Sequence, residues 1–343
     1  MNYSSRCVYV EYVWVGGNNE LRSKCRILSR STEPILRLSE IPDWNYDGSS
    51  TNQAHGTKSE IIIKSRALFR DPFRENGYMV LCDTYTPDGN PLYNNTRHYA
   101  NNIFNKNLHQ EPWFGMEQEY FLIDPYTNKP LGFDGSKRQG QYYCGIGYEN
   151  ASCGRKIVEE HMKKCIFAGI KLSGINAEVA PGQWEFQVGP CVGIQAGDHL
   201  LMARYILHRV GEIHQVNINL EPKPLKGDWN GSGCHTNYST KNMREGTLDK
   251  TGLVVINEAI EKLSRKHKKH MDVYGSGNEE RMTGEHETAS YDKFTDGIGN
   301  RGVSIRICAD TIKNEKGYFE DRRPSSNCDP YLVTSAIFQT TCL

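Results

Sequence analysis

The sequence of 343 residues shows no excess of charge of either sign. Lys plus Arg number 41 and Asp plus Glu number 41, so the formal net charge is zero. Proteins that hold nucleic acid usually carry a basic excess on at least one domain, so this balance argues against a nucleic-acid partner. No apolar run approaches the roughly 20 residues that a membrane helix needs, so we expect no membrane partner either.

Cysteine pairs with regular spacing are also missing. The 11 cysteines, an odd number, run from Cys7 to Cys342, and no two have CxxC spacing. This distribution argues against a disulfide framework and against a cysteine-based zinc site. The opening segment, MNYSSRCVYVEYVWVGG, lacks the basic stretch followed by an apolar core that a secretory signal requires. We therefore expect a cytoplasmic protein in a reducing compartment.

The sequence has no Walker motif for binding phosphate. The segment GFDGSKRQG contains Gly-Ser-Lys without the required spacing, and GSGC lacks the lysine. If ATP binds, metal ions and arginines must hold its phosphates. The guanidinium group suits this role because its planar fork binds two oxygens at once, although each candidate could instead form an ordinary salt bridge. The candidates cluster late in the chain and are Arg281, Arg301, Arg306, Arg322 and Arg323.

What the sequence does have is a change of pattern near residue 90. Before it, four β-branched and aromatic runs, CVYVEYVWV, LRSKCRIL, SEIIIKSRALF and YMVLCDTY, predict strands, and DWNYDGSST (43–51) predicts an exposed loop. The segment TPDGNPLYNN (86–95) marks a candidate domain boundary. After it, helix and strand patterns mix, and DHLLMARYILHRVGEIHQV (198–216) predicts a helix with Asp198 as its N-cap.

Acidic residues recur inside apolar runs of this second region. Glu117 and Glu119 lie two residues apart in WFGMEQEYF, and a strand would turn both to one face. Alone, each acidic residue could be a salt-bridged glutamate, and His235 a buried core histidine. Together they predict an oxygen-rich pocket with one imidazole, whose carboxylates repel one another unless cations lie between them. Carboxylate ligands suit Mg²⁺ or Mn²⁺, ions that commonly position nucleotide phosphates.

At this point a family resemblance is visible. The motifs WNYDGSST, RDPFR, WFGMEQEYFL, YYCGIG, NAEVAPGQWEFQVGP, DWNGSGCHTNYST, GNRGVSIRI and GYFEDRRPSSNCDPY resemble glutamine synthetase of the eukaryotic type (type II), in order over nearly the whole chain. The resemblance implies an α+β fold, with an N-terminal β-grasp domain (1–93) and a larger catalytic domain (94–343) built on a curved antiparallel sheet with flanking helices. It also implies a homo-oligomer of two stacked pentameric rings, a decamer, in which neighbouring subunits share each active site.

The same resemblance assigns roles to individual residues. It implies two metal sites, one formed by Glu119, Glu178 and Glu185 and the other by Glu117, His235 and Glu320. The implied ATP-binding residues are Trp113, Ser239, Arg306 and Tyr318, and the implied glutamate-binding residues are Asn230, Gly231, Arg281, Arg301 and Arg322. The resemblance also implies that Arg301 lies beside the transferred phosphoryl group. It further implies that Asp47 binds ammonium and helps to deprotonate it, and that Glu287 belongs to a mobile flap that shields the intermediate.

The implied reaction joins ammonia to the γ-carboxylate of L-glutamate, with ATP as co-substrate and γ-glutamyl phosphate as intermediate. Three residues depart from the family pattern at nucleotide and flap positions, namely Glu280, Glu285 and Asp310. The sequence also begins close to its first predicted strand, so we expect weaker contacts between rings. Two alternatives remain, a ligase of the same fold that uses another amine and a non-catalytic structural relative. Intact Asp47 and the complete set of metal ligands favour the ammonia ligase.

Overall fold

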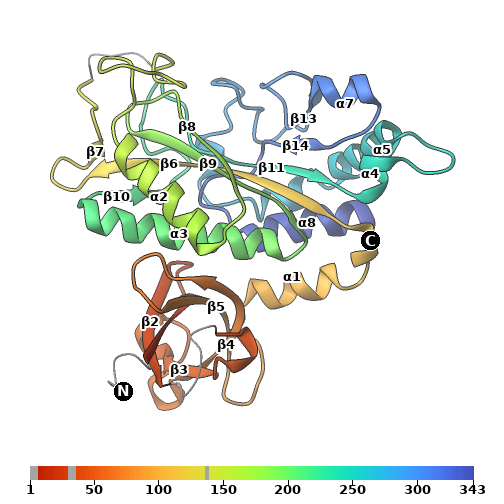
Figure 1. The fold of residues 1–343 in the computed structure, drawn as a ribbon. Helices are drawn as coiled ribbons and strands as arrows, with labels where there is room; N and C mark the ends of the chain where they lie inside the picture. The colour runs from red at the N-terminus through yellow and green to blue at the C-terminus, as the bar shows by residue number, and fades with distance from the viewer. Residues whose placement is uncertain (1–6, 30–35, 136–138) are drawn as a thin grey trace. The chain divides into compact units, whose positions relative to one another are not determined.

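The computed structural model describes residues 7–29, 36–135 and 139–343 (Figure 1). The chain divides into two compact units. The first comprises Met1–Tyr99 together with Lys163–Ile170 and Leu201–Ile206, and the second comprises the remaining residues. The predicted domain boundary between residues 93 and 94 stays a prediction, because the first unit also includes these two short segments from later in the chain.

The first unit is built on a five-stranded sheet in the order β2-β1-β5-β4-β3. Strands β1 and β5 are parallel, and the other neighbours are antiparallel. Alternate residues of β1, such as Val8, Val10 and Tyr12, point to the same face of the sheet and pack into one apolar cluster. The strands confirm the four predicted runs and are β1 (Cys7–Val15), β2 (Leu21–Ser29), β3 (Trp44–Asp47), β4 (Glu60–Arg70) and β5 (Gly77–Tyr85).

The predicted loop at residues 43–51 is wrong in its first half. Trp44–Asp47 forms the edge strand β3, paired with β4, and a 3-10 turn follows at Gly48–Thr51. Turn-forming residues dominate this segment, but Trp44 and Tyr46 pack against the core of the sheet. Their apolar burial, together with pairing to a long neighbouring strand, outweighs the local turn preference.

The second unit contains a nine-stranded sheet whose main path is β12-β13-β14-β11-β6-β9-β8, with β10 and β7 paired to β6. All pairs in this sheet are antiparallel except the short edge pair β12–β13. Strand β6 lies at the centre (Figure 1). The strands are β6 (Trp113–Asp124), β7 (Lys129–Pro130), β8 (Leu172–Ala177), β9 (Gln183–Val192), β10 (Asn217–Asn219), β11 (Cys234–Ser239), β12 (Asp296–Ile298), β13 (Ile305–Ile307) and β14 (Phe319–Asp321).

Helices cover one face of this sheet, and Figure 1 shows α3 and α8 beneath it. On that face, Phe114 of β6 contacts Phe104 of α1, which in turn contacts Phe338 of α8. Burying each such ring contributes about 1.5–3 kcal/mol. The helices are α1 (Thr96–Phe104), α2 (Arg155–Ala168), α3 (Gln195–His214), α4 (Lys241–Glu245), α5 (Gly252–Arg265), α6 (His267–Met271), α7 (Ala309–Asn314) and α8 (Pro330–Cys342).

The predicted N-cap of α3 is wrong. The helix begins at Gln195 with Ile194 as its N-cap, so Asp198 lies within the first turn. The carboxylate of Asp198 accepts a hydrogen bond of 2.6 Å from the hydroxyl of Tyr331, on α8. The Asp198 side chain therefore binds a buried residue of another helix, although the local sequence predicted that it would cap α3.

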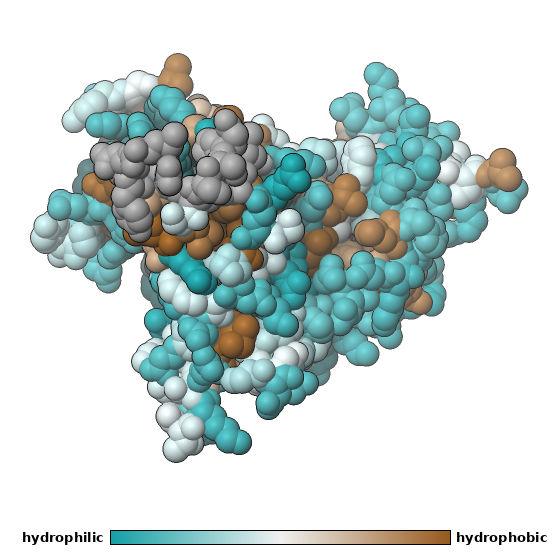
Figure 2. All heavy atoms as spheres, turned by 60° about the horizontal axis from the view of Figure 1, so that its bottom comes forward, coloured by the Kyte–Doolittle hydropathy of each residue, from teal (hydrophilic) through white to brown (hydrophobic). Residues whose placement is uncertain are grey.

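The α+β prediction is confirmed, with a five-stranded N-terminal sheet and a larger unit of sheet and helices. In the described part of the chain, no helix is long and apolar enough to cross a membrane. Hydrophilic residues cover most of the face drawn in Figure 2, and apolar residues appear there in small separate groups. Such scattered apolar exposure is normal for a protein surface.

Candidate active site

Strand alternation divides β6 into an apolar face and an acidic face. Phe114, on the helix side, contacts the core of the second unit, and Glu117 and Glu119 point to the opposite side of the sheet. The sequence prediction that these two carboxylates share a face follows from this alternation. They lie side by side on the open face of the central strand.

Cross-strand pairing brings residues from distant segments next to this pair. Glu117 lies opposite His235 of β11, and Glu119 lies opposite Glu185 of β9. Directly opposite residues in antiparallel strands share a face, with Cβ atoms about 5 Å apart. On the far side of β11, Glu320 of β14 lies opposite Asn237 and Arg306. One row of polar side chains therefore crosses the whole sheet.

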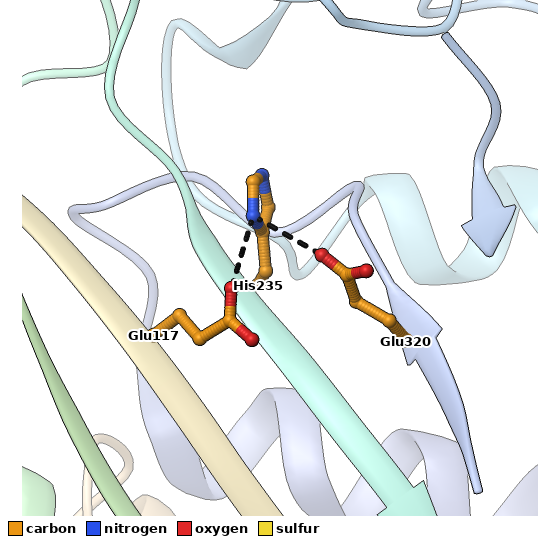
Figure 3. Close-up of side chains that lie close together, drawn as sticks. All are labelled: Glu117, His235 and Glu320. Carbon is orange, nitrogen blue, oxygen red and sulfur yellow. Dashed lines mark ion pairs between the residues drawn. The ribbon is translucent and has the colours of Figure 1, made fainter. Parts of the chain in front are cut away.

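Glu117, His235 and Glu320 form the closest cluster in this row (Figure 3). Their ligand atoms lie within 4.8 Å of one another, and within the described ranges they are the only such group of three or more. Nδ1 of His235 lies 3.6 Å from Oε2 of Glu117 and 3.4 Å from Oε1 of Glu320. Burial, reinforced by the nearby Arg322, lowers the pKa of His235, which keeps the imidazole in the neutral form that binds metals. This donor set suits a divalent cation.

Glu119, Glu178 and Glu185 form the second predicted group. Burial is the largest cause that raises the pKa of each, and repulsion from neighbouring carboxylates adds to it. Glu119 is stabilised by the N–H of Gly233, which donates to its Oε2 at 3.0 Å, and Glu178 accepts from Asn176 at 2.9 Å. Burial and mutual repulsion still raise the pKa of all three carboxyl groups despite such hydrogen bonds, and a cation between them would relieve the repulsion.

Both acidic groups line one polar cavity of about 240 Å³ in the second unit. Glu320 itself is fully buried beside it. The predicted site residues that line this cavity are Glu117, Glu119, Glu178, Glu185, Asn230, Gly231, His235, Arg281, Glu287, Arg301, Arg306 and Arg322. Segments that are far apart in sequence thus meet at one place, as the sequence prediction requires.

Arg322 ties three parts of the cavity wall together. Its Nη1 donates to Oε1 of Glu320 at 2.8 Å, its Nε to the carbonyl of Arg301 at 3.0 Å, and its Nη2 to the carbonyl of Glu287 at 3.1 Å. Arg306 holds the other oxygen of Glu320. A carboxylate that accepts hydrogen bonds from two guanidinium groups keeps its orientation.

Arg281 is held by neutral acceptors. Its Nη2 donates to the carbonyls of Arg323 at 2.7 Å and Arg322 at 3.1 Å, and its Nε to Oδ1 of Asn278 at 2.9 Å. Its positive charge therefore remains available to an anion in the cavity. Gly231 packs against this side chain, because a Cβ there would clash with Cγ of Arg281 and with the carbonyl of Pro222.

Arg323, the fifth arginine candidate, follows the end of β14 by two residues and does not line this cavity. It forms a fully buried ion pair with Asp321, with Nη2 2.7 Å from Oδ2. Tyr274 donates to the same carboxylate at 2.7 Å. The pair therefore holds β14 from the side opposite Arg322, which lines the cavity.

We expect Arg323→Met to lower the free energy of unfolding by about 3–5 kcal/mol, because it leaves the carboxylate of Asp321 buried without its cation. Urea denaturation measures this change. The double variant Asp321→Asn/Arg323→Met removes both charges and should recover part of the loss. Equal stability of Arg323→Met and the unsubstituted protein would show that the pair does not hold the strand.

A second cavity, of about 390 Å³, contains the remaining predicted ATP-binding residues Trp113, Ser239 and Tyr318. It is lined mainly by apolar groups, including Phe114 and Pro190. The guanidinium of Arg244 lies 3.9 Å from the ring centroid of Trp113, and its Nη1 donates to Oγ of Ser239 at 3.0 Å. An aromatic ring beside apolar and hydroxyl groups suits a nucleobase.

Asp47 belongs to the first unit and lies at the end of β3. Its carboxylate is exposed and accepts hydrogen bonds from the hydroxyls of Ser49 at 2.6 Å and Ser50 at 2.8 Å. These hydrogen bonds lower the pKa of Asp47 to about 2. The group is therefore fully ionised at neutral pH and attracts cations.

Sequence reasoning missed several neutral and aromatic side chains in the cavity wall, namely Tyr143, Asn176, Gln183, Gln187 and His286. Two of them could have been found. Asn176 and Gln187 stand two residues from Glu178 and Glu185, and the strand period turns such neighbours to the same face. Neutral amides carry no charge, so their place in the cavity wall is less evident from the sequence than that of carboxylates and arginines.

The three departures from the family pattern have ordinary structural settings. Glu280 forms an exposed ion pair with Lys226. Glu285 is an exposed residue of the segment that carries Glu287. Asp310 lies in the first turn of α7, where a negative charge is favoured by the helix dipole. None of the three lines the polar cavity.

The chain is similar in sequence to known proteins. Residues 94–259 match the family model of the glutamine synthetase catalytic domain. The chain is 56% identical over 344 residues to a putative glutamine synthetase of Acanthamoeba polyphaga mimivirus, covering 99% of this chain and 96% of the relative. It is 55% identical over 343 residues to the chloroplastic glutamine synthetase of Brassica napus (98% and 78% covered). It is also 55% identical over 345 residues to a cytosolic isozyme of Medicago sativa (98% and 94% covered).

Proposed function

The chain belongs to the glutamine synthetase family, and on that premise we propose how its residues carry out the reaction. The protein is a glutamate–ammonia ligase that uses ATP, glutamate and ammonia, and the family requires divalent metal ions. The observation that carries the proposal is the row of carboxylates and His235 that crosses one face of the sheet beside several arginines.

The reaction has a chemical difficulty that explains these residues. A carboxylate resists attack by an amine because oxide is a poor leaving group, so the γ-carboxylate of glutamate is first phosphorylated by ATP. Phosphoryl transfer needs alignment and charge neutralisation more than covalent help. Bound Mg²⁺ or Mn²⁺, at two or more positions per site, would supply Lewis-acid neutralisation of the phosphates.

The cavity residues hold the reactants. Glu117, His235 and Glu320 would hold one cation, and Glu119, Glu178 and Glu185 a second. Trp113, Ser239, Tyr318 and Arg306 would bind the nucleotide, and Asn230, Gly231, Arg281, Arg301 and Arg322 the glutamate substrate. Support comes from the adjacency of Glu320, Arg306 and Arg322, which places fixed positive charge beside one metal group. Arg301 would neutralise the phosphoryl group in transfer.

The intermediate γ-glutamyl phosphate must be kept from water until ammonia attacks. Glu287 lines the cavity, and the segment around it, residues 283–290, closes on itself through a bridge between Thr283 and Ser290. We call this segment the flap. The carboxylate of Glu287 would cover the acyl phosphate and accept a proton from the attacking amine.

Asp47 would attract ammonium to the site of a neighbouring subunit. A carboxylate with a pKa of about 2 is a weak proton acceptor, so its contribution rests on charge attraction. This role requires the proposed ring assembly, two stacked pentamers with shared active sites. We further propose a cytoplasmic location, supported by the absence of disulfides among the described residues.

The direct test measures ATP- and glutamate-dependent phosphate release with ammonia, hydroxylamine or small amines as acceptors. We expect one phosphate released per glutamine formed with ammonia. Release with another amine but not with ammonia would show a ligase of different specificity. Absence of release with every acceptor would point to a non-catalytic relative.

We expect Asp47→Asn to raise the KM for ammonium by about tenfold or more, because the variant loses the negative charge that attracts this cation. Hydroxylamine is a neutral nucleophile, so the hydroxylamine-dependent rate should change much less. Asp43→Asn, at an exposed carboxylate nearby, is the matched control. An unchanged ammonium dependence in Asp47→Asn would reject the proposed role.

A further inference from the structure

The flap is connected to the glutamate-binding turn through side chains that have no assigned role. His286, immediately before Glu287, lies among three loops of the second unit. Its Nε2 is 3.0 Å from Oδ1 of Asp228, and its Nδ1 is 3.1 Å from Nε2 of Gln139. Gln139 in turn accepts a hydrogen bond of 2.7 Å from the backbone N–H of Asn230.

The direction of these contacts is determined by the backbone. The N–H of Asn230 can only donate, so the oxygen of the Gln139 amide faces it and the NH₂ group faces His286. Nδ1 of His286 therefore accepts, and the proton of the neutral imidazole sits on Nε2, the nitrogen that faces Asp228. The chain Asn230–Gln139–His286–Asp228 is thus consistent with a neutral imidazole and does not require its protonation.

The flap backbone needs such an external support. His286 and Glu287 both have positive φ angles, 52° and 60°, although neither is glycine. L-residues rarely adopt this left-handed region, and two in succession persist only when surrounding contacts hold them. On the Glu287 side the contact is the Arg322 hydrogen bond to its carbonyl. On the His286 side it is the pair with Asp228 and Gln139.

We propose that His286 is a positioning residue that latches the flap closed and so aims the carboxylate of Glu287 at the reacting carbonyl. The inference rests on the proposed function and adds to it a link between the glutamate-binding turn and the flap. The backbone of Asn230, which would bind glutamate, and the imidazole that orients Glu287 share one hydrogen-bonded side chain, Gln139. Glutamate bound at the Asn230 turn therefore favours the closed flap.

The latch is suited to repeated opening. The Asp228 side chain is 94% exposed, and a hydrogen bond at such an exposed position contributes little net stability because water competes for both partners. The flap can therefore release for substrate entry and product exit while still favouring the closed state when glutamate is bound. A deeply buried pair in the same place would hold the cavity shut.

The proposal is tested by the coupling between phosphate release and glutamine formation. When the flap fails to close, water attacks γ-glutamyl phosphate, breaks the acyl–phosphate anhydride and returns glutamate plus phosphate, so ATP is consumed without glutamine. We expect His286→Ala to release at least about two phosphates per glutamine, where the unsubstituted enzyme releases one. We also expect a lower kcat and a smaller change in the KM for ATP, because the nucleotide lies in a different cavity.

Matched variants distinguish a positioning role of His286 from a loss of folding. Asp228→Ala should give the same uncoupling as His286→Ala, and the double variant no more than either alone, because the two act as one unit. His286→Gln keeps an N–H donor and should restore part of the coupling. His109→Ala and Asp249→Ala, at exposed positions away from the cavity, are controls.

A one-to-one ratio in His286→Ala, with unchanged kcat, would overturn the latch while leaving the proposed function intact. Uncoupling accompanied by a lowered unfolding midpoint, without rescue by His286→Gln, would also overturn it. If the unsubstituted protein forms no glutamine, the proposed function itself fails, which is a distinguishable outcome.

Discussion

Glu119→Gln is expected to reduce turnover by about 10³-fold or more, because the loss of a metal-binding carboxylate removes about 4 kcal/mol of transition-state stabilisation. The substitution keeps the size and shape of the side chain and removes only its charge. Glu119 lies at the centre of the acidic row, opposite Glu185 and two residues from Glu117. The measurement is the initial rate of ATP-dependent glutamine formation at saturating substrates and saturating Mg²⁺.

The same variant should be at least as stable as the unsubstituted protein when no metal is present. Burial and neighbouring carboxylates raise the pKa of Glu119, so its negative charge destabilises the metal-free fold. A neutral amide removes that cost. Glu221→Gln, at an exposed position, is the control for the substitution type. Near-normal turnover in Glu119→Gln, or a collapse of its stability, would contradict the metal-binding role.

Chelation of divalent cations is expected to abolish turnover and to lower the stability of the protein. A ligand present at 100 times its Kd stabilises the folded state by about 2.7 kcal/mol per site, so two occupied sites give about twice that amount. The physical reason is the carboxylate row, where a cation replaces repulsion by attraction. Thermal unfolding with EDTA, and after restoring Mg²⁺ or Mn²⁺, measures the effect.

Glu185→Gln provides the control for this second prediction. Its side chain keeps the hydrogen bond from Gln187, so the local structure should persist. The variant should show a smaller cation-induced rise in unfolding temperature than the unsubstituted protein. If EDTA leaves both activity and unfolding temperature unchanged, the acidic groups do not bind metal.

The sequence predicted the direction of a side chain where the two-residue period of a strand determines it. Two-residue spacing predicted that Glu117 and Glu119 share a face, and both line the polar cavity beside β6. Arg322 lines the cavity, whereas the next residue, Arg323, is buried in its ion pair with Asp321. Neighbouring arginines in one motif therefore differ in role because their side chains enter different surroundings.

The sequence did not predict structure that depends on contacts between distant segments of the chain. Trp44 and Tyr46 form a strand within a turn-rich segment because the apolar core of the sheet buries their rings. Asp198 binds Tyr331 instead of capping its helix. His286 gave no signal, because its partners Asp228 and Gln139 are far away in sequence and neither belongs to a periodic element. Such contacts require the fold before they can be identified.

The central claim is that the carboxylate row gathers divalent cations that face the nucleotide, and crystals soaked with Mn²⁺ and a non-hydrolysable ATP analogue test it most directly. The account predicts one anomalous peak among Glu117, His235 and Glu320 and another among Glu119, Glu178 and Glu185. Anomalous density that is absent from both positions, or found only elsewhere on the molecule, would contradict it.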